Sequence, residues 1–264
     1  MSRPVGLPKM KDKFLSRSGL RVSAIALGGW LTYGGYVETD IALIYMKATF
    51  DIGINFFDFA KSYSSRGSER TVRAFNHLIN TGKAFYWGTS EWNADEIATA
   101  WRYTEKLNPD GARDGAAAVE KEFEHLYEEV GLGLTIFSPL KLGILTGKYL
   151  DGIPEDSRLK TCNDPFVVDL SLRVGGEAWK KEMEMVARLK PVAQQLGITQ
   201  ASLAMAWVLS NKRVSSAITA VSRPEQIYES VRALNAIEKL TPEVLKEIDE
   251  ILGNNPGVTI GRFG

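Results

Sequence analysis

The sequence is poor in cysteine and histidine, and it has no long apolar run. Of its 264 residues, one is a cysteine, Cys162, and two are histidines. A single thiol cannot form an internal disulfide, which favours a reducing compartment, and so few thiols and imidazoles argue against a metal site. No run of about 18 apolar residues could span a membrane, and the first residues lack the apolar core of a secretory signal. We therefore expect a soluble cytoplasmic protein without a bound metal.

Net charge is absent as well. The 32 Lys and Arg residues balance the 32 Asp and Glu residues, so no bulk field draws the chain to nucleic acid or to an anionic membrane surface. The GxGxxG motif of a Rossmann domain is missing. With 44% hydrophobic and 24% charged residues, the composition is that of an ordinary globular protein. No linker or repeat divides the chain, so we expect a single domain over residues 1–264.

Apolar runs alternate with helical patterns along the chain. A hairpin is expected at residues 13–22, where Ser18 and Gly19 form the turn. Buried strands are expected at residues 22–30, 54–60, 83–90, 132–140 and 215–222. The alternation with helices predicts a parallel sheet with helices packed outside it, either open or closed into a barrel.

The helices in the first half have clear boundary signals. Asp40 is expected to cap a helix that buries Ile41, Ile44, Tyr45 and Ala48 and ends near Gly53. Further helices are expected at residues 71–82, 93–107 and 117–131.

In the second half, residues 141–176 are rich in Gly, Pro, Asp and Ser, which predicts a long surface loop. A helix at 179–196 should be kinked or broken by Pro191, and another follows at 199–210. Ser222 and Glu225 form a capping-box pattern for the next helix. Thr241 is expected to cap the last one, with Pro242 at its first position.

Four motifs resemble the aldo-keto reductases, in particular the branch that contains potassium-channel β subunits and their fungal and plant relatives. They occur in the family's order, at residues 53–63 (GINFFDFAKSY), 73–92, 137–159 and 222–230. The resemblance implies a (β/α)8 barrel of the TIM type with an N-terminal β-hairpin. It also implies NADPH-dependent reduction of a small aldehyde or ketone.

The resemblance further implies which residues act. Tyr63 matches the tyrosine that donates a proton to the carbonyl oxygen, and Asp58 matches the aspartate that holds a neighbouring lysine. In the family that lysine lowers the phenol pKa from about 10, and a histidine orients the carbonyl. The positions that match cofactor contacts are Trp30, Asp58, Ser90, Phe137, Ser138, Pro139, Leu140, Lys148, Arg158, Ser222, Arg223, Gln226 and Glu229.

Arg223 is expected to pair with a 2′-phosphate at a helix N-terminus, which would favour NADPH over NADH. Taken alone, the same residues would describe only a capped surface helix. If the resemblance holds, Asp58, Tyr63, Ser90, Phe137 and Ser222 should lie around one cleft at the carboxyl ends of the strands.

The sequence departs from the family at two places. The segment that ends at Arg70 runs straight into Thr71, where the family has its third strand, third helix and fourth strand. The sixth strand is replaced by NPDGARDGAA at residues 108–117. The barrel is therefore expected to be incomplete, without strands 3, 4 and 6, and the positions of the catalytic lysine and histidine are missing. Skipped exons in a gene prediction would produce the same pattern.

Replacement residues are not evident. Lys61 is read as a solvated loop lysine, and His77 and His125 as residues within helices. Three hypotheses stay open: a carbonyl reductase, for example one of fungal specialised metabolism; a catalytically impaired NADPH-binding or interaction subunit; and a decayed remnant. The missing lysine and histidine favour the last two.

Overall fold

The computed structural model describes residues 4–15, 19–30, 39–58, 127 and 131–253. The elements expected at residues 71–82, 83–90 and 93–107 lie outside this range, as does nearly all of the helix expected at 117–131. The statements below concern the described residues.

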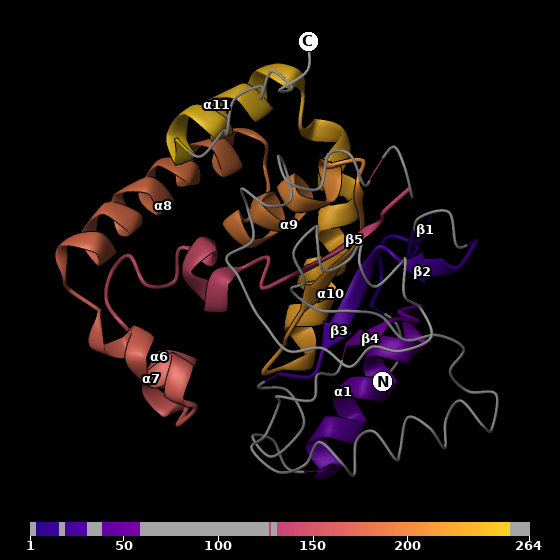
Figure 1. Cartoon of the computed structure of the whole chain (residues 1–264), viewed down its shortest axis with the longest axis horizontal. Helices are drawn as coiled ribbons and strands as arrows, with labels where there is room; N and C mark the ends of the chain where they lie inside the picture. Colours follow the sequence, from indigo (N-terminus) through magenta and orange to yellow (C-terminus); the bar gives the residue numbers. More distant parts are fainter. Residues whose placement is uncertain (1–3, 16–18, 31–38, 59–126, 128–130, 254–264) are drawn as a thin grey trace, which may run out of the picture.

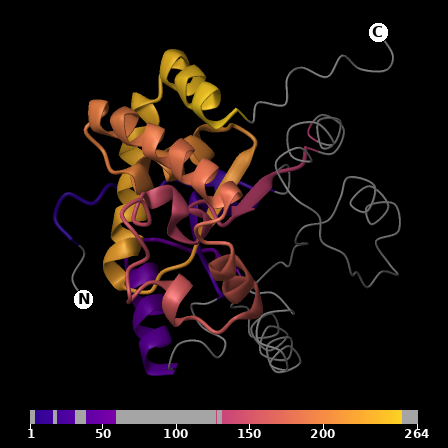
Figure 2. The same cartoon turned by 90° about the vertical axis from the view of Figure 1, so that its left-hand side faces the viewer.

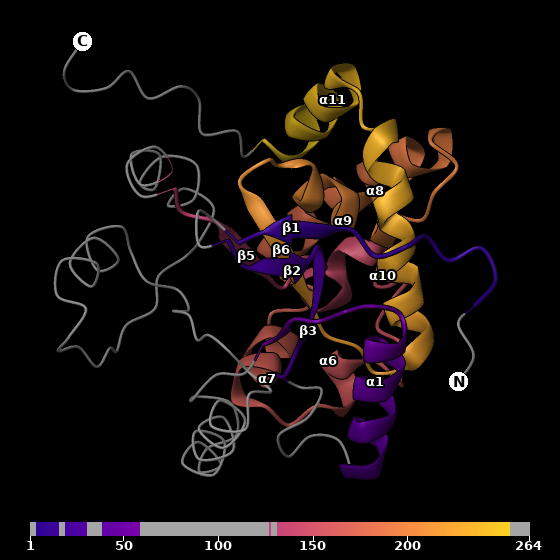
Figure 3. The same ribbon diagram turned by 90° about the vertical axis from the view of Figure 1, so that its right-hand side faces the viewer.

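The expected N-terminal hairpin is confirmed. Strands β1 (Asp12–Phe14) and β2 (Arg21–Ser23) pair antiparallel, with Lys13 opposite Val22. The ammonium of Lys13 donates to the carbonyl oxygens of Leu209 (3.1 Å) and Val214 (2.9 Å). The Ser215 hydroxyl donates to the carbonyl of Phe14 at 3.1 Å. The hairpin thus crosses the amino end of the main sheet (Figure 3).

The main sheet has four parallel strands in the described part of the chain. They are β3 (Ile25–Gly28), β4 (Phe57–Asp58), β5 (Leu134–Phe137) and β6 (Val214–Thr219), and their order is β4-β3-β6-β5. The expected parallel sheet is confirmed, although each strand is shorter than the apolar run that predicted it. β3, an early strand, pairs with β6, the last one, which is the contact that closes a (β/α) barrel.

Helix α1 (Thr39–Asp51) forms close to the expected place, but Asp40 lies in its first turn instead of capping it, and the helix buries a different face. Tyr45 and Ala48 are buried as predicted, whereas Ile41 and Ile44 are 42% and 49% exposed. Tyr45 and Ala48 share the inner face with Ala42, Thr49 and Ile52. The small Ala42 takes the place against the core that the branched Ile41 was expected to fill. The helix ends as predicted at Gly53, which has a φ of +93°.

The prediction of a long surface loop at residues 141–176 is wrong, because this stretch is folded. It contains the 3₁₀ segment η3 (Lys141–Thr146) and helices α6 (Arg158–Thr161) and α7 (Pro165–Leu172). Its apolar side chains form a second hydrophobic core with Trp179 and Val186, separate from the main one. The Gly, Pro and Asp residues end or cap these short helices instead of marking a solvated loop. Figure 1 shows α6 and α7 lying together, apart from α11.

Five C-terminal elements complete the described fold: α8 (Glu177–Gln195), α9 (Gln200–Ser210), α10 (Pro224–Ala236), η4 (Ile237–Lys239) and α11 (Pro242–Leu252). Thr199 and Thr241 cap α9 and α11 through their hydroxyls. Pro191 does not break α8, which is continuous. Ala187, whose carbonyl would bond to residue 191, is on the exposed side of the helix, where water can replace the missing N–H.

The main core lies between the sheet and these helices. α9 packs on β6 and α10, and α1 packs beside α10, so that α1, α9 and α10 cover one face of the sheet (Figures 1 and 2). No helix in the described ranges is both long and apolar enough to cross a membrane.

Candidate functional site

Four predicted site residues gather at one edge of the sheet. Asp58 ends β4 opposite Gly28, and Phe137 ends β5 opposite Ile218. Trp30 follows β3 by two positions, and Ser222 follows β6 by three. Since all four strands are parallel, their carboxyl ends share this edge, as the predicted clustering requires. The other two members, Tyr63 and Ser90, lie outside the described residues.

Trp30 and Asp58 are both half-buried at this edge. The backbone carbonyl of Asp58 accepts from Gly29 N at 2.9 Å, which ties the ends of β3 and β4 together. The indole N–H of Trp30 donates to Asp164 Oδ2 at 3.3 Å. The Trp30 indole, which was predicted to lie beside the nicotinamide, is therefore held in place by the start of α7, a helix that the sequence did not predict.

The turn after β5 has an unusual backbone. Ser138, Lys141 and Leu142 have φ values of +48°, +45° and +53°, in the left-handed region that non-glycine residues rarely adopt. Each such residue costs on the order of 1–2 kcal/mol, and clusters of them occur where a backbone is shaped for a ligand. Ser138 is a predicted contact and is half-buried, Pro139 is buried, and Leu140 packs against the main core. Phe137 is 51% exposed.

The Lys148 side chain folds back over Gly143 in this turn. A Cβ at Gly143, where φ is +92°, would lie 2.5 Å from Lys148 Cε and 2.7 Å from Nζ. The missing side chain of Gly143 thus makes room for the ammonium group. The same group lies 4.8 Å from the centre of the Tyr149 ring.

Three cations come together around this turn: Lys148, Arg158 at the start of α6, and Arg223 at the start of α10. Burial lowers the pKa of Lys148, the charges of Arg158 and Arg223 lower it further, and Asp156 acts in the opposite direction. Burial also lowers the pKa of Arg158. None of the three forms an ion pair within the described part of the chain. Such a cluster favours an anion.

Ser157 and Tyr149 lie beside these cations. The Ser157 side chain is buried, and its hydroxyl faces the Tyr149 phenol but forms no hydrogen bond of ordinary geometry among the described residues. The Tyr149 hydroxyl donates to the carbonyl of Leu142 at 3.1 Å, and burial raises the pKa of this phenol. A buried hydroxyl without a partner costs about 1–3 kcal/mol, which a ligand oxygen could recover.

The N-terminus of α10 is built differently from the prediction. The N-cap is Arg223, not Ser222, and the side chain that completes the cap is Gln226, not Glu225. Gln226 Oε1 accepts from the backbone N–H groups of Ser222 (2.7 Å) and Arg223 (3.3 Å). The capping-box prediction was one position out because Pro224, which lacks an N–H, occupies the first helical position. These two N–H groups, expected to be open to an anion, already have a partner.

A shallow hollow of about 580 Å³ lies between the first turns of α9 and α10. Three predicted cofactor residues line it: Arg223, Gln226 and Glu229. Glu229 Oε1 accepts from the Thr199 hydroxyl at 2.8 Å. The other lining residues are Thr199, Ser202, Glu225 and Arg232.

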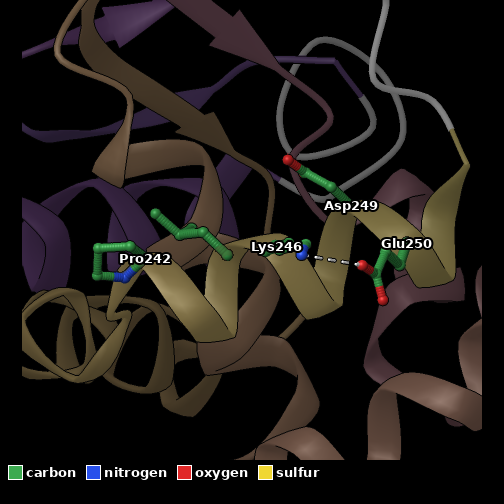
Figure 4. A pocket seen from close by; sticks show the side chains of 5 residues that line it. Pro242, Lys246, Asp249 and Glu250 are labelled. Carbon is green, nitrogen blue, oxygen red and sulfur yellow. Dashed lines mark ion pairs between the residues drawn. The ribbon is translucent and has the colours of Figure 1, made fainter.

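A second hollow lies on the surface of α11 (Figure 4). It is lined by one helix alone, where Lys246 pairs with Glu250 at 3.8 Å. No predicted site residue lines it, and both members of this ion pair are exposed, so we assign it no role.

Sequence reasoning missed four residues that shape the site: Tyr45, Ser157, Asp164 and Thr199. Tyr45, expected only in the core, donates its hydroxyl to the carbonyl of Ser222 at 2.6 Å. Asp164 precedes a proline, which is a helix-start signal that could have been found. The other contacts join residues far apart in the sequence and left no local pattern.

The sequence is similar to proteins described as voltage-gated potassium channel β subunits. A protein from Schizosaccharomyces pombe, described as a putative subunit of this kind, is 37% identical, and the alignment covers 92% of this chain and 94% of the relative. Two proteins described as probable subunits of this kind, from Oryza sativa and Arabidopsis thaliana, are 34% and 32% identical. Each alignment covers 94% of this chain and 98% of the relative. Each alignment runs over 327 positions, more than the 264 residues here, so the relatives contain stretches without a counterpart in this chain.

Residues 68–253 match the sequence profile of the aldo/keto reductase family. This match covers more than half of the chain, and the relatives above match nearly all of it. The parallel sheet, with its first and last strands paired, agrees with the (β/α)8 barrel that the family implies. The chain therefore belongs to the aldo/keto reductase family.

Proposed function

We propose that this chain binds NADPH at the carboxyl edge of its sheet and is an NADPH-dependent oxidoreductase for an aldehyde or ketone. The observation that carries the proposal is the group of three cations, Lys148, Arg158 and Arg223, which form no ion pair with any described residue. A group of cations without carboxylate partners is costly unless an anion binds it. The phosphates of NADPH would supply that anion.

The residues present fit such a cofactor. Lys148 and Arg158 would contact its phosphates, and the buried Ser157 hydroxyl lies in the same region. Arg223 would pair with the 2′-phosphate, and Glu229, in the adjacent hollow, would accept from the adenine amine. Trp30, Asp58 and Ser90 would lie toward the nicotinamide, together with the turn that contains Ser138, Pro139 and Leu140.

NADPH, when bound, supplies a hydride to the carbonyl carbon. In the proposed chemistry Tyr63 donates the proton to the carbonyl oxygen, and Asp58 would hold the lysine that lowers the tyrosine pKa. We infer that this lysine and the histidine were lost with strands 3, 4 and 6. The length of the alignments with the relatives supports that loss. Tyr63 would then keep a high pKa, and reduction would be slow.

A second candidate is an NADPH-binding subunit whose function is interaction instead of catalysis. The description of the similar proteins as channel β subunits favours it, as does the absence of the lysine and histidine positions from the sequence. An aldehyde or ketone of fungal specialised metabolism is a further hypothesis for the substrate, since one of these relatives is fungal.

The proposal is tested by titrating the protein with NADPH and NADH and following nicotinamide fluorescence. We expect NADPH to bind about 10- to 100-fold more tightly, the range of a charge-assisted contact to the 2′-phosphate. Arg223→Gln should remove most of this preference, and Arg158→Met should weaken both cofactors.

Lys246→Gln, which changes an exposed lysine on α11, is the matched control and should bind like the wild type. No binding of either cofactor would exclude the proposal. Tight NADPH binding without turnover of a panel of aldehydes and ketones would favour the second candidate.

A further inference from the structure

The segment that carries two of the cations has its own hydrophobic core. We name residues 141–172 the covering segment; its buried side chains Ile144, Tyr149, Leu159 and Val167 pack with Trp179 and Val186 of α8. Among the described residues, one member of this cluster comes from the N-terminal strands, and it is Trp30. Trp30 is therefore the contact that joins this core to the end of β3.

Two interactions hold Trp30 to α7. Its indole N–H donates to Asp164 Oδ2 at 3.3 Å, across 134 positions of sequence. Its ring meets the Phe166 ring edge-on, with centroids 5.5 Å apart and an angle of 63° between the planes. Such a ring pair contributes about 0.5–1.5 kcal/mol beyond the area it buries.

The Asp164 carboxylate accepts two hydrogen bonds, one with each oxygen. While Oδ2 accepts from Trp30, Oδ1 accepts from Phe166 N at 2.9 Å and so caps α7. The side chain is 9% exposed, so water competes little for either oxygen. One carboxylate therefore sets both the start of α7 and the position of the indole.

The consequence concerns Arg158. It starts α6, which packs on α7, and it lies in the sequence between Lys148 and Asp164. If the contact between Trp30 and Asp164 opens, the far end of the covering segment loses the hydrogen bond that, among the described residues, ties it to the end of β3. The two cations that the segment carries would then be free to move away from the sheet.

We propose that Asp164 is a positioning residue that latches the covering segment to Trp30 and thereby slows the release of a bound pyridine dinucleotide. The proposal rests on the proposed function, because it requires that the dinucleotide bind under Lys148 and Arg158. Neither Asp164 nor Phe166 need touch the ligand; Asp164 acts through Trp30 and α7.

The test compares Asp164→Ser, Trp30→Phe and the double variant in the full chain. Serine can still cap α7 but is too short to reach the indole, and phenylalanine keeps the ring contact but lacks the N–H. Each single variant should release NADP about tenfold faster in stopped-flow displacement, the effect of one hydrogen bond to a charged group. The double variant should be no faster than the quicker single one, since both remove the same contact. Asp169→Asn, an exposed acid on the same helix, should match the wild type.

Hydrogen exchange of the ligand-free protein separates this proposal from the previous one. Amides of residues 158–172 should exchange faster than in the wild type in both single variants, and in Asp169→Asn they should exchange at the wild-type rate. The latch would be overturned, even if NADP binds, by unchanged hydrogen exchange in the single variants. It would also be overturned if the effects of the two substitutions on NADP release simply add in the double variant. If the wild type does not bind NADP, the cofactor proposal and the effect on release both fail, and the exchange result still decides whether the latch exists.

Discussion

At the scale of single residues, burial lowers the pKa of two lysines, Lys13 and Lys148, which have different partners. Lys13 donates to two backbone carbonyls, whereas Lys148 lies beside two arginines and an aromatic ring. The first arrangement holds the hairpin on the sheet. The second is costly in the free protein and becomes favourable with an anion.

Lys13→Met should destabilise the protein. The methionine keeps most of the apolar stem but leaves the carbonyls of Leu209 and Val214 without their donor. We expect a loss of about 1–2 kcal/mol, below the full value of a charged hydrogen bond because the site is only half-buried. Urea unfolding measures the loss, and Lys11→Met is the control. Lys11 pairs with Glu238 at 3.6 Å on the surface, so its removal should cost little. Equal effects of the two variants would contradict the assigned role of Lys13.

Lys148 predicts how NADPH affinity depends on pH. Its pKa in the free protein is below the ordinary 10.5, and a bound phosphate would raise it again. Affinity should therefore be full below the free-state pKa and fall as the pH rises through it, before an ordinary lysine would lose its proton. Dissociation constants measured between about pH 7 and pH 10 check this. Lys148→Arg should abolish the decline, because guanidinium stays charged; a decline that persists in this variant would rule Lys148 out as its cause.

At the scale of elements, the covering segment and the first turns of α9 and α10 carry the candidate site. Residues with positive φ, among them Gly143, Gly147 and Gly152, lie within η3 and between η3 and α6. The segment is attached at η3 through an ion pair of 2.5 Å between Lys141 and Glu182. Helix α9 begins at Thr199, whose hydroxyl also reaches across to α10.

Thr199→Val should affect both elements. It removes the N-cap of α9, worth about 1 kcal/mol, and the donor that orients the Glu229 carboxylate. Thr199→Asp keeps a capping oxygen but places a second carboxylate beside Glu229. We expect the valine variant to lose stability in urea unfolding and the aspartate variant to lose less, while both bind NADPH more weakly. Thr199→Ser, which retains both hydrogen bonds, should behave like the wild type. If NADPH binds unchanged to the valine and aspartate variants, Thr199 acts on stability alone.

At the scale of the whole molecule, the described sheet contains the strands on either side of the closure of a barrel. A closed ring of this type needs eight strands of matched tilt in all. The open strand edges and core faces of an incomplete ring are costly against a typical net stability of about 5–15 kcal/mol.

The last prediction is that this chain reduces carbonyls very poorly even when NADPH is bound. Acid–base assistance contributes about 10²–10⁴-fold, and without a lysine to lower the Tyr63 pKa we expect a loss of that order. A misplaced substrate could lose a further 10²-fold. Consumption of NADPH with a panel of aldehydes measures the rate. Inserting the missing strands of a close relative, with their lysine and histidine, should restore activity; the same insertion with both residues changed to alanine should not. Turnover of the unmodified chain at ordinary rates would mean that another residue, Lys61 first, replaces them.

The sequence by itself determined the features that depend on neighbours within a few positions. The hairpin, the parallel alternation, the cap Thr241 and the family motifs were all readable in this way, because a turn or a cap needs only local residues. The tertiary structure decided whatever depends on distant pairs. It chose Ala42 over Ile41 for the core face of α1, and it turned a Gly- and Pro-rich stretch into packed helices. It also joined Asp164 to Trp30 and brought Lys148, Arg158 and Arg223 together, since burial and charge act between residues that the sequence keeps far apart.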